Sequence, residues 1–144
     1  MSAEENKAVV RRFITEVIAG GNMALTEELV APNYVNHSLP PGSPPGVEGL
    51  TLLLATLRAG FPDIQFSIED LIAEGDKVVA RYTVRGTHRG DFQGIPPTGK
   101  QIALRGLAYY RLEGGKIAED EPIVDQFSLL QQLGAIPAPG AGGQ

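Results

Sequence analysis

The stretch that decides the fold is 117–134, with the sequence IAEDEPIVDQFSLLQQLG. A strand is predicted through Ile117, Glu119, Glu121 and Ile123, and it ends at Asp125. A short apolar helix follows, and Gly134 is predicted to end it, since glycine readily takes the positive φ found just past a helix. Glu121 and Asp125 are four residues apart on a strand of period two, so the two carboxylates share one face.

Asp125 stands where this strand ends and the helix begins. An aspartate there commonly caps the helix by accepting hydrogen bonds from its first free N–H groups. A carboxylate at such a position can also act in catalysis. Spacing alone favours the cap.

The residues before this stretch predict a hairpin. A long strand covers 100–112, and the tight turn Glu113-Gly114-Gly115 leads back into the strand that starts at Ile117. Arg105 lies in the middle of the first strand among apolar residues. If the hairpin carries a β-bulge, the side chains that face the same way are those of Arg105, Leu107, Glu121 and Asp125. Arg105 then serves either as a structural partner of a carboxylate or as a functional group, and the sequence favours neither.

Helices precede the strands along the chain. A capping box at Ser2 and Glu5 opens a helix whose apolar residues recur at helical spacing up to the Gly20-Gly21 pair. A short second helix is predicted to stop at Pro32, and a third covers about 48–58. Alternating strands follow over 64–68 and 77–88. This order predicts an α+β fold, a curved antiparallel sheet with three N-terminal helices on one side. A single domain is expected over 1–134, with a loose Pro- and Gly-rich tail over 135–144.

Composition excludes several classes of function. The chain has 144 residues, 42% of them hydrophobic and 20% charged, as in an ordinary globular domain. A net charge of −5 argues against a nucleic-acid partner, and the absence of cysteine excludes thiol chemistry. The acidic N-terminus has no apolar segment typical of a signal peptide, and no stretch is long enough to span a bilayer, so we expect a cytoplasmic protein. We find no convincing set of metal ligands and no phosphate-binding loop.

Two histidines are candidates for chemistry. His37 follows Tyr34 at the predicted exit of the second helix, next to a rigid Pro-rich loop. A histidine in such a place more often makes local hydrogen bonds than catalyses a reaction. His88 lies in the polar segment THRGDFQG, where we expect exposure to solvent.

Several segments together resemble the SnoaL-like polyketide cyclase family. They are GTHRGDFQGIPPTGK (86–100), IALRGLAYYRLEGGKIAEDE (102–121) and VDQFSLLQQLG (124–134), joined by NKAVVRRFITEVIAGG (6–21) and ELVAPNYVNH (28–37). The resemblance implies the cone-shaped fold of the nuclear-transport-factor-like superfamily, with a pocket on the concave face of the sheet. It also implies a cofactor-free aldol condensation in which the aspartate matching Asp125 is the general acid/base.

The chain departs from the family pattern just before that aspartate. The family commonly has Glu-His-Trp where this chain has Glu119-Asp120-Glu121, so Glu121 replaces a large aromatic wall of the pocket. The expected substrate is a small apolar carbonyl or ester compound. One alternative is a limonene-type epoxide hydrolase, whose Asp-Arg-Asp set is matched in part by Arg105 and Asp125. Another is a non-catalytic module that binds a small ligand or dimerises.

These inferences give a specific site and assembly. Asp125 is the expected acid/base, with His37 and Arg105 as its catalytic partners and no cofactor or metal. The pocket is predicted to be lined further by Tyr34, Phe61, Leu107, Glu121 and Phe13. Leu104, Ala108 and Tyr110 are predicted to form an apolar outer face of the sheet, which is too large to leave in water. We therefore expect a homodimer through that face.

Overall fold

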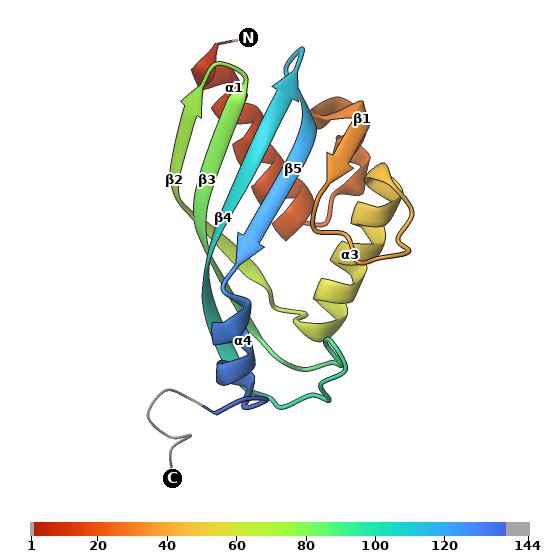
Figure 1. Ribbon diagram of the computed structural model, residues 1–144, viewed down its shortest axis with the longest axis vertical. Coiled ribbons are helices and arrows are strands. Elements are labelled where there is room, and N and C mark those ends of the chain that lie inside the picture. Colours follow the sequence, from red (N-terminus) through yellow and green to blue (C-terminus); the bar gives the residue numbers. More distant parts are fainter. Residues whose placement is uncertain (1, 138–144) are drawn as a thin grey trace.

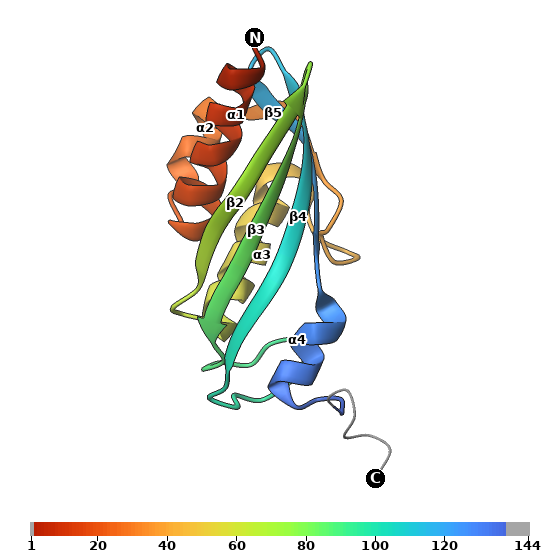
Figure 2. The same cartoon turned by 90° about the vertical axis from the view of Figure 1, so that its left-hand side faces the viewer.

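The computed structural model describes residues 2–137 and shows a curved, open sheet with helices on its concave side (Figures 1 and 2). The five strands lie in the order β1-β5-β4-β3-β2, with β1 parallel to β5 and all other pairs antiparallel. The strands are β1 (Val30–Asn36), β2 (Gln65–Glu74), β3 (Lys77–Thr87), β4 (Gln101–Glu113) and β5 (Lys116–Val124). The helices are α1 (Ala3–Arg12), α2 (Thr26–Leu29), α3 (Gly46–Gly60) and α4 (Gln126–Leu133), with a π-helical segment η1 (Phe13–Ala19) and a 3-10 turn η2 (Met23–Leu25). The α+β prediction is confirmed.

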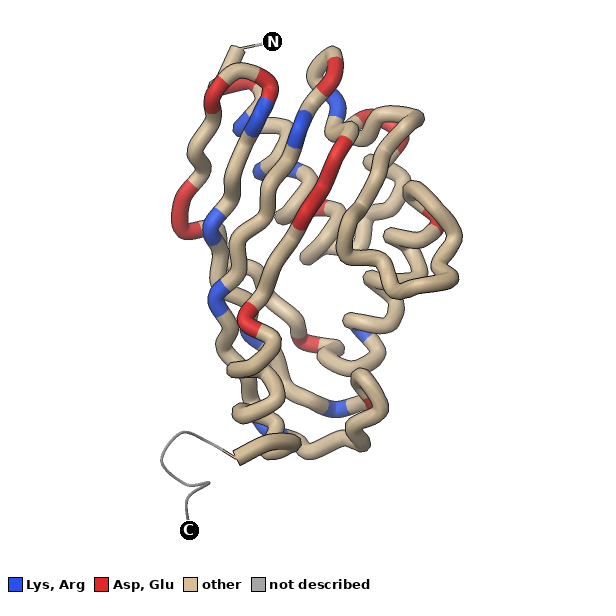
Figure 3. Tube along the Cα trace, viewed as in Figure 1, with Lys and Arg blue, Asp and Glu red and all other residues tan. Residues whose placement is uncertain are grey.

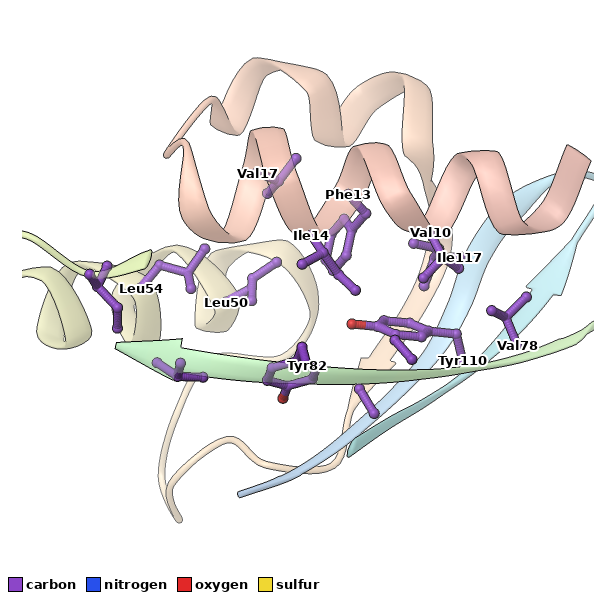
Figure 4. Packing of buried hydrophobic residues seen from close by; sticks show 14 of the residues in the cluster. Val10, Phe13, Ile14, Val17, Leu50, Leu54, Val78, Tyr82, Tyr110 and Ile117 are labelled. Carbon is purple, nitrogen blue, oxygen red and sulfur yellow. The ribbon is translucent and has the colours of Figure 1, made fainter. Parts of the chain in front are cut away.

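The first helical layer forms as its pattern predicts. Ser2 and Glu5 make a reciprocal capping box that satisfies two free backbone donors at the start of α1. Val10, Phe13 and Val17 are fully buried against the sheet, and α3 contributes Leu50 and Leu54 to the same core (Figure 4). The second predicted helix is reduced to η2 and the single turn of α2.

The sequence did not reveal β1. The segment around Tyr34 was expected to be a helix exit, but Val30–Asn36 is a strand paired in parallel with β5. Pro32 lies within it, and β1 is an edge strand of the sheet, where a missing N–H costs little. This strand matters for the site, because it brings Tyr34 and Asn36 beside β5.

A β-bulge in the β4–β5 hairpin decides which side chains point inward. Arg111 pairs with Glu119 but Leu112 pairs with Ile117, so Ala118 is the extra residue. Ile117 and Ala118 are consequently both buried, and beyond them the inward phase falls on even-numbered residues. The same-face prediction for Arg105, Leu107, Glu121 and Asp125 is confirmed, but they share the exposed outer face.

The inner face of β4 carries the residues that were expected outside. Leu104, Ala108 and Tyr110 are all buried in the core. The prediction that these three form the outer face is therefore wrong. The sheet was placed the wrong way round because the phase of a strand fixes which residues share a face and leaves open which face is inside.

Helix α4 packs beside β4 where β5 has ended, and its Gln132 side chain hydrogen-bonds to the β4 backbone. The side-chain amide of Gln132 accepts a hydrogen bond from the backbone N–H of Ala103 (2.8 Å) and donates one to its carbonyl (2.9 Å), as a neighbouring strand would. Gly134 has a φ of 80° just past the helix, as predicted. Within the described residues, none of the helices has the length and apolar character needed to cross a lipid bilayer.

Candidate functional site

A largely apolar cavity lies between the concave face of the sheet and the helical layer. Its volume is about 280 Å³. Apolar side chains from both the helices and the sheet form most of its wall, including Ile14, Ile18, Leu50, Leu54, Leu57 and Leu104. Asp120 is the one acidic residue among the lining side chains. Such a cavity suits a small apolar molecule and presents one carboxyl group to it.

Asp120 is held by donors from β1. Its side chain is only 2% exposed. The hydroxyl of Tyr34 donates a 2.8 Å hydrogen bond to Oδ2, and the Asn36 amide donates to the Tyr34 oxygen (3.0 Å) and more weakly to Oδ2 (3.5 Å). Ser38 fixes that amide by donating to its oxygen from both its backbone N–H and its hydroxyl. Oδ1 of Asp120 is buried and has no hydrogen-bond partner among the described residues.

Burial dominates the ionisation of Asp120. Removal from water raises the pKa of this carboxyl from 3.8 to about 7, because the charged form is disfavoured in an apolar setting. The hydrogen bond from Tyr34 and the nearby charge of His37 act in the opposite direction and lower the pKa. The carboxyl therefore has comparable acid and base populations near neutral pH, which suits a group that both takes and returns a proton.

Two further tyrosines line the cavity beside Asp120. Burial raises the pKa of Tyr82 and of Tyr110 well above the ordinary value, and the charge of Asp120 raises both further. Both phenols therefore stay protonated and can act as hydrogen-bond donors. Figure 4 shows the Tyr110 ring between the sheet and the helical layer, and the Tyr82 ring close to the sheet with its hydroxyl pointing away from the helices.

Three of the predicted pocket residues lie in the interior. Phe61 lines the cavity. Tyr34 is buried but does not line the cavity, and its hydroxyl is hydrogen-bonded to Asp120 and Asn36, which do. Phe13 is fully buried in the core, where it packs against Tyr34 and Tyr110, with ring centroids 6.5 and 6.0 Å away.

The other predicted pocket residues lie on the surface. Asp125 is exposed and caps α4 by accepting a 3.0 Å hydrogen bond from the backbone N–H of Ser128. Arg105, Leu107 and Glu121 are exposed on the outer face of the sheet, and Leu107 is 51% exposed. The prediction that these four residues line the pocket is wrong, because the face that they share is the outer face of the sheet.

His37 also faces away from the cavity. Its Nε2 lies 2.7 Å from Oε2 of Glu119, and Arg111 donates to the other oxygen of the same carboxylate (3.0 Å). The ring is partly exposed in this surface network. The predicted position over the pocket is therefore wrong, and His37 affects Asp120 only through its charge and through a backbone N–H that donates to the Asp120 carbonyl (2.9 Å). His88, expected to be exposed, is fully buried against the Phe61 ring.

The sequence did contain a signal for Asp120. Acidic residues run along β5 (Figure 3), and most of them share the exposed phase of the strand. Asp120 instead shares the inner face of the strand with Pro122 and Val124. This face is the less polar one, and all three residues line the cavity. An acid in the apolar phase of a half-buried strand is the exception that marks a site. The signal for Asn36 was absent, because it depends on the pairing of β1 with β5.

Metal ligands do not gather within residues 2–137, where no three His, Asp or Glu side chains are placed to hold an ion. The cavity contains the carboxyl of Asp120, two phenols and the amides of Asn36, Gln93 and Gln126 as its main polar groups. These groups can move a proton and hydrogen-bond an oxygen atom.

Comparison with known proteins agrees with this architecture. The sequence profile of the SnoaL-like polyketide cyclase family matches residues 8–133. The nogalonic acid methyl ester cyclase of Streptomyces nogalater is 29% identical over 111 residues, which cover 75% of this chain and 82% of that protein. TsrD from Streptomyces laurentii superposes with a TM-score of 0.84 at 25% identity, covering 94% of this chain and 99% of TsrD. A candidate polyketide cyclase from Acidithiobacillus ferrooxidans superposes with a TM-score of 0.79 at 34% identity, covering 94% of this chain and 99% of that one. From the matched profile, the fold and the apolar cavity on the concave face, the chain belongs to the SnoaL-like polyketide cyclase family.

Proposed function

We propose that the protein cyclises a small carbonyl compound by general acid/base catalysis without a cofactor, and that Asp120 carries the proton. The observation that supports this proposal is the free Oδ1 of Asp120 in an apolar cavity. Its partner oxygen is already occupied by the Tyr34 hydroxyl. One oxygen is thus left to meet a substrate, and its position is fixed by the other.

The reaction follows from this arrangement. Oδ1 of the ionised carboxyl takes a proton from a carbon next to a carbonyl group, and the electron pair of the C–H bond moves into an enolate. The enolate carbon attacks a second carbonyl carbon of the same molecule and forms the new C–C bond. The resulting alkoxide takes the proton back from the protonated Asp120, which restores the carboxylate. Every atom and electron is accounted for within the substrate and one carboxyl group.

The cavity limits the size of the ligand. A volume of about 280 Å³ lies at the lower end of the range for small-molecule sites. We therefore infer a compact substrate with one or two rings and few polar atoms. A charged ligand is disfavoured, because a second buried negative charge would face Asp120.

Hydrogen–deuterium exchange tests this function without knowledge of the natural substrate. The probe is β-tetralone, a bicyclic ketone whose benzylic C–H next to the carbonyl exchanges with D₂O when a base removes the proton. We expect the protein to accelerate the exchange seen by NMR, and Asp120→Asn to reduce the acceleration by about 10²-fold or more. Glu121→Gln is the matched control, because it removes the neighbouring acid on the outer face and should leave exchange intact.

The outcomes separate the candidate functions. Unchanged exchange in Asp120→Asn would reject Asp120 as the base. Binding of β-tetralone with no acceleration by the unmodified protein would favour the non-catalytic binding module. The epoxide hydrolase alternative gains no support, because Arg105 and Asp125 lie outside the cavity.

We also retain the homodimer as a proposal, now through different residues. The outer face of the sheet exposes Val79, Leu107 and Ile123, of which the last two pair directly across β4 and β5. Ile123 is 66% exposed. A second copy that covers this face would remove these side chains from water.

A further inference from the structure

The Tyr82 ring packs over Gly106, a position where the neighbouring strand β4 has no side chain. Tyr82 pairs with Gly106 of β4, and Gly106 pairs in turn with Val124 of β5. A Cβ atom built on Gly106 would lie 2.6 Å from Cε2, 2.8 Å from Cζ and 3.1 Å from the hydroxyl oxygen of Tyr82. Only glycine leaves room for this ring to lie flat on β4. The ring is thereby directed along the inner face of the sheet toward β5, the strand that carries Asp120.

Tyr110 approaches Asp120 from the same strand as Gly106. Tyr110 and Asp120 are direct cross-strand partners between β4 and β5, and both side chains are on the inner face. Directly opposite residues on one face of an antiparallel pair have adjacent side chains. An edge-to-face contact with Phe13, at 6.0 Å between centroids, packs the Tyr110 ring against the helical layer.

Both hydroxyl groups differ from that of Tyr34 in one respect. Tyr34 donates to Asp120, whereas neither Tyr82 nor Tyr110 donates to any residue in the described part of the chain. Both side chains nevertheless line the cavity and are at most 5% exposed. Neither hydroxyl oxygen is among the fully enclosed atoms that lack a partner, so each keeps some accessible surface, and both residues line the cavity. Two such free donors beside one carboxyl indicate a position for an acceptor atom of a ligand.

We propose that Tyr82 and Tyr110 bind the carbonyl oxygen of the substrate and stabilise the negative charge that forms on it when Asp120 removes the neighbouring proton. This inference rests on the proposed function and specifies its substrate as a ketone or ester whose oxygen accepts hydrogen bonds from both phenols. The C–H proton goes to Oδ1 of Asp120, and the electron pair becomes the enolate whose oxygen the phenols hold. Donors fixed in an apolar site stabilise such charge more strongly than water does.

Gly106 acts as the specificity-determining residue of this arrangement. Glycine within a strand normally weakens it, because it adds backbone freedom and no side chain to pack. Here the missing side chain is what lets Tyr82 reach over β4. A larger residue at this position would displace the ring and its hydroxyl.

Binding of a ketone, measured by infrared spectroscopy, tests the proposal independently of turnover. The probe is β-tetralone with a ¹³C-labelled carbonyl, at about pH 8.5, where most Asp120 carboxyls are ionised and cannot donate. We expect the carbonyl stretch to move to lower frequency on binding, and this shift to shrink in Tyr82→Phe and in Tyr110→Phe. The affinity for β-tetralone should fall by about fivefold in each variant, as for the loss of one neutral hydrogen bond.

Two controls and one further variant make the result decisive. Tetralin, which has the same rings and no oxygen, should bind equally well to the unmodified protein and to both phenylalanine variants. Tyr109→Phe removes the next hydroxyl along β4, on the opposite face, and should change nothing. Gly106→Ala should reduce the infrared shift as Tyr82→Phe does, because the added methyl displaces the ring.

An unchanged carbonyl stretch in either phenylalanine variant, or no shift on mixing with the unmodified protein, would overturn the proposal. A reduced shift together with normal deuterium exchange in Asp120→Asn would instead reject Asp120 as the base and leave the carbonyl site in place. The two failures are therefore distinguishable.

Discussion

The hydroxyl of Tyr34 donates a 2.8 Å hydrogen bond to Oδ2 of Asp120, a residue 86 positions further along the chain. The contact joins β1 to β5 inside the core, and both residues are nearly inaccessible to solvent. It has two effects: it occupies one oxygen of the carboxyl and it favours the ionised form. The free oxygen and the proton affinity of the site therefore depend on the same bond.

Tyr34→Phe should raise the pKa of Asp120. The hydrogen bond from Tyr34 lowers this pKa, so its loss moves the midpoint upward, by about one pH unit for a bond to a charged group. The pH dependence of β-tetralone exchange measures the midpoint, because only the ionised carboxyl can take the proton. Tyr109→Phe, on the outer face, should leave it unchanged. A midpoint that stays in place in Tyr34→Phe would mean that this bond does not control the carboxyl.

Asp120 should make the protein less stable as the pH rises. Its pKa is about 7 in the folded chain, whereas an aspartate in water has a pKa of 3.8, so the folded state holds more protons between these values. The free energy of unfolding therefore falls as the pH rises from about 4 to about 7, by roughly 4 kcal/mol at most. Asp120→Asn cannot ionise and should be more stable than the unmodified protein at pH values above 7.

Thermal unfolding at a series of pH values checks this second prediction. Below about pH 4 the carboxyl is protonated in both states, so Asp120→Asn should show little advantage there. The exposed neighbour provides the control, and Glu121→Gln should follow the unmodified protein at every pH. Parallel curves for the unmodified protein and Asp120→Asn would show that burial does not raise the pKa of Asp120.

Asp125→Ala should lower the free energy of unfolding by about 1 kcal/mol, because α4 loses its N-cap. Asp125→Asn keeps a capping oxygen and should cost less. Both variants should catalyse the hydrogen–deuterium exchange of β-tetralone at the normal rate, since Asp125 lies outside the cavity. Chemical denaturation and the exchange assay measure the two quantities separately. Loss of exchange in a stable Asp125→Asn would restore the catalytic role that the family resemblance implies.

Ile123→Lys should dissociate the proposed homodimer. Ile123 and Leu107 are adjacent on the outer face of the sheet, and a charge there would have to be buried in the interface. Analytical ultracentrifugation at micromolar concentration should show a dimer for the unmodified protein and a monomer for the variant. Leu52→Lys is matched, because Leu52 is 54% exposed but lies on α3. A monomeric unmodified protein would reject the homodimer.

Local patterns in the sequence were sufficient for most of the fold. The capping box at Ser2 and the turn at Gly114-Gly115 involve residues close in the chain, and both were predicted correctly. Strand β1 was missed because its partner is 80 or more residues away and its own sequence contains a proline. The expected loose tail at 135–144 lies mostly outside the described residues.

The site was harder to predict than the fold, because it depends on orientation. Alternation along β4 and β5 identified which residues share a face, including Arg105 and Asp125, but the inner face could not be recognised from that alternation. The face that carries the charged side chains was predicted to line the pocket, whereas most charged side chains face water. Only Phe61 was both predicted and found in the cavity wall, while Asp120 was identified from the structure.

The extra residue at Ala118 shifts the inward and outward alternation of the rest of β5 by one residue. Every position from Glu119 to Val124 owes its inward or outward direction to that single insertion. Deleting Ala118 would exchange the two sides in one step, bringing Glu119 and Glu121 inward and expelling Asp120 and Val124. A substitution changes the cavity at one residue only. A one-residue change in hairpin length replaces the acid in the cavity, so homologues that differ in length here should be compared by which residues point inward and not by sequence alignment alone.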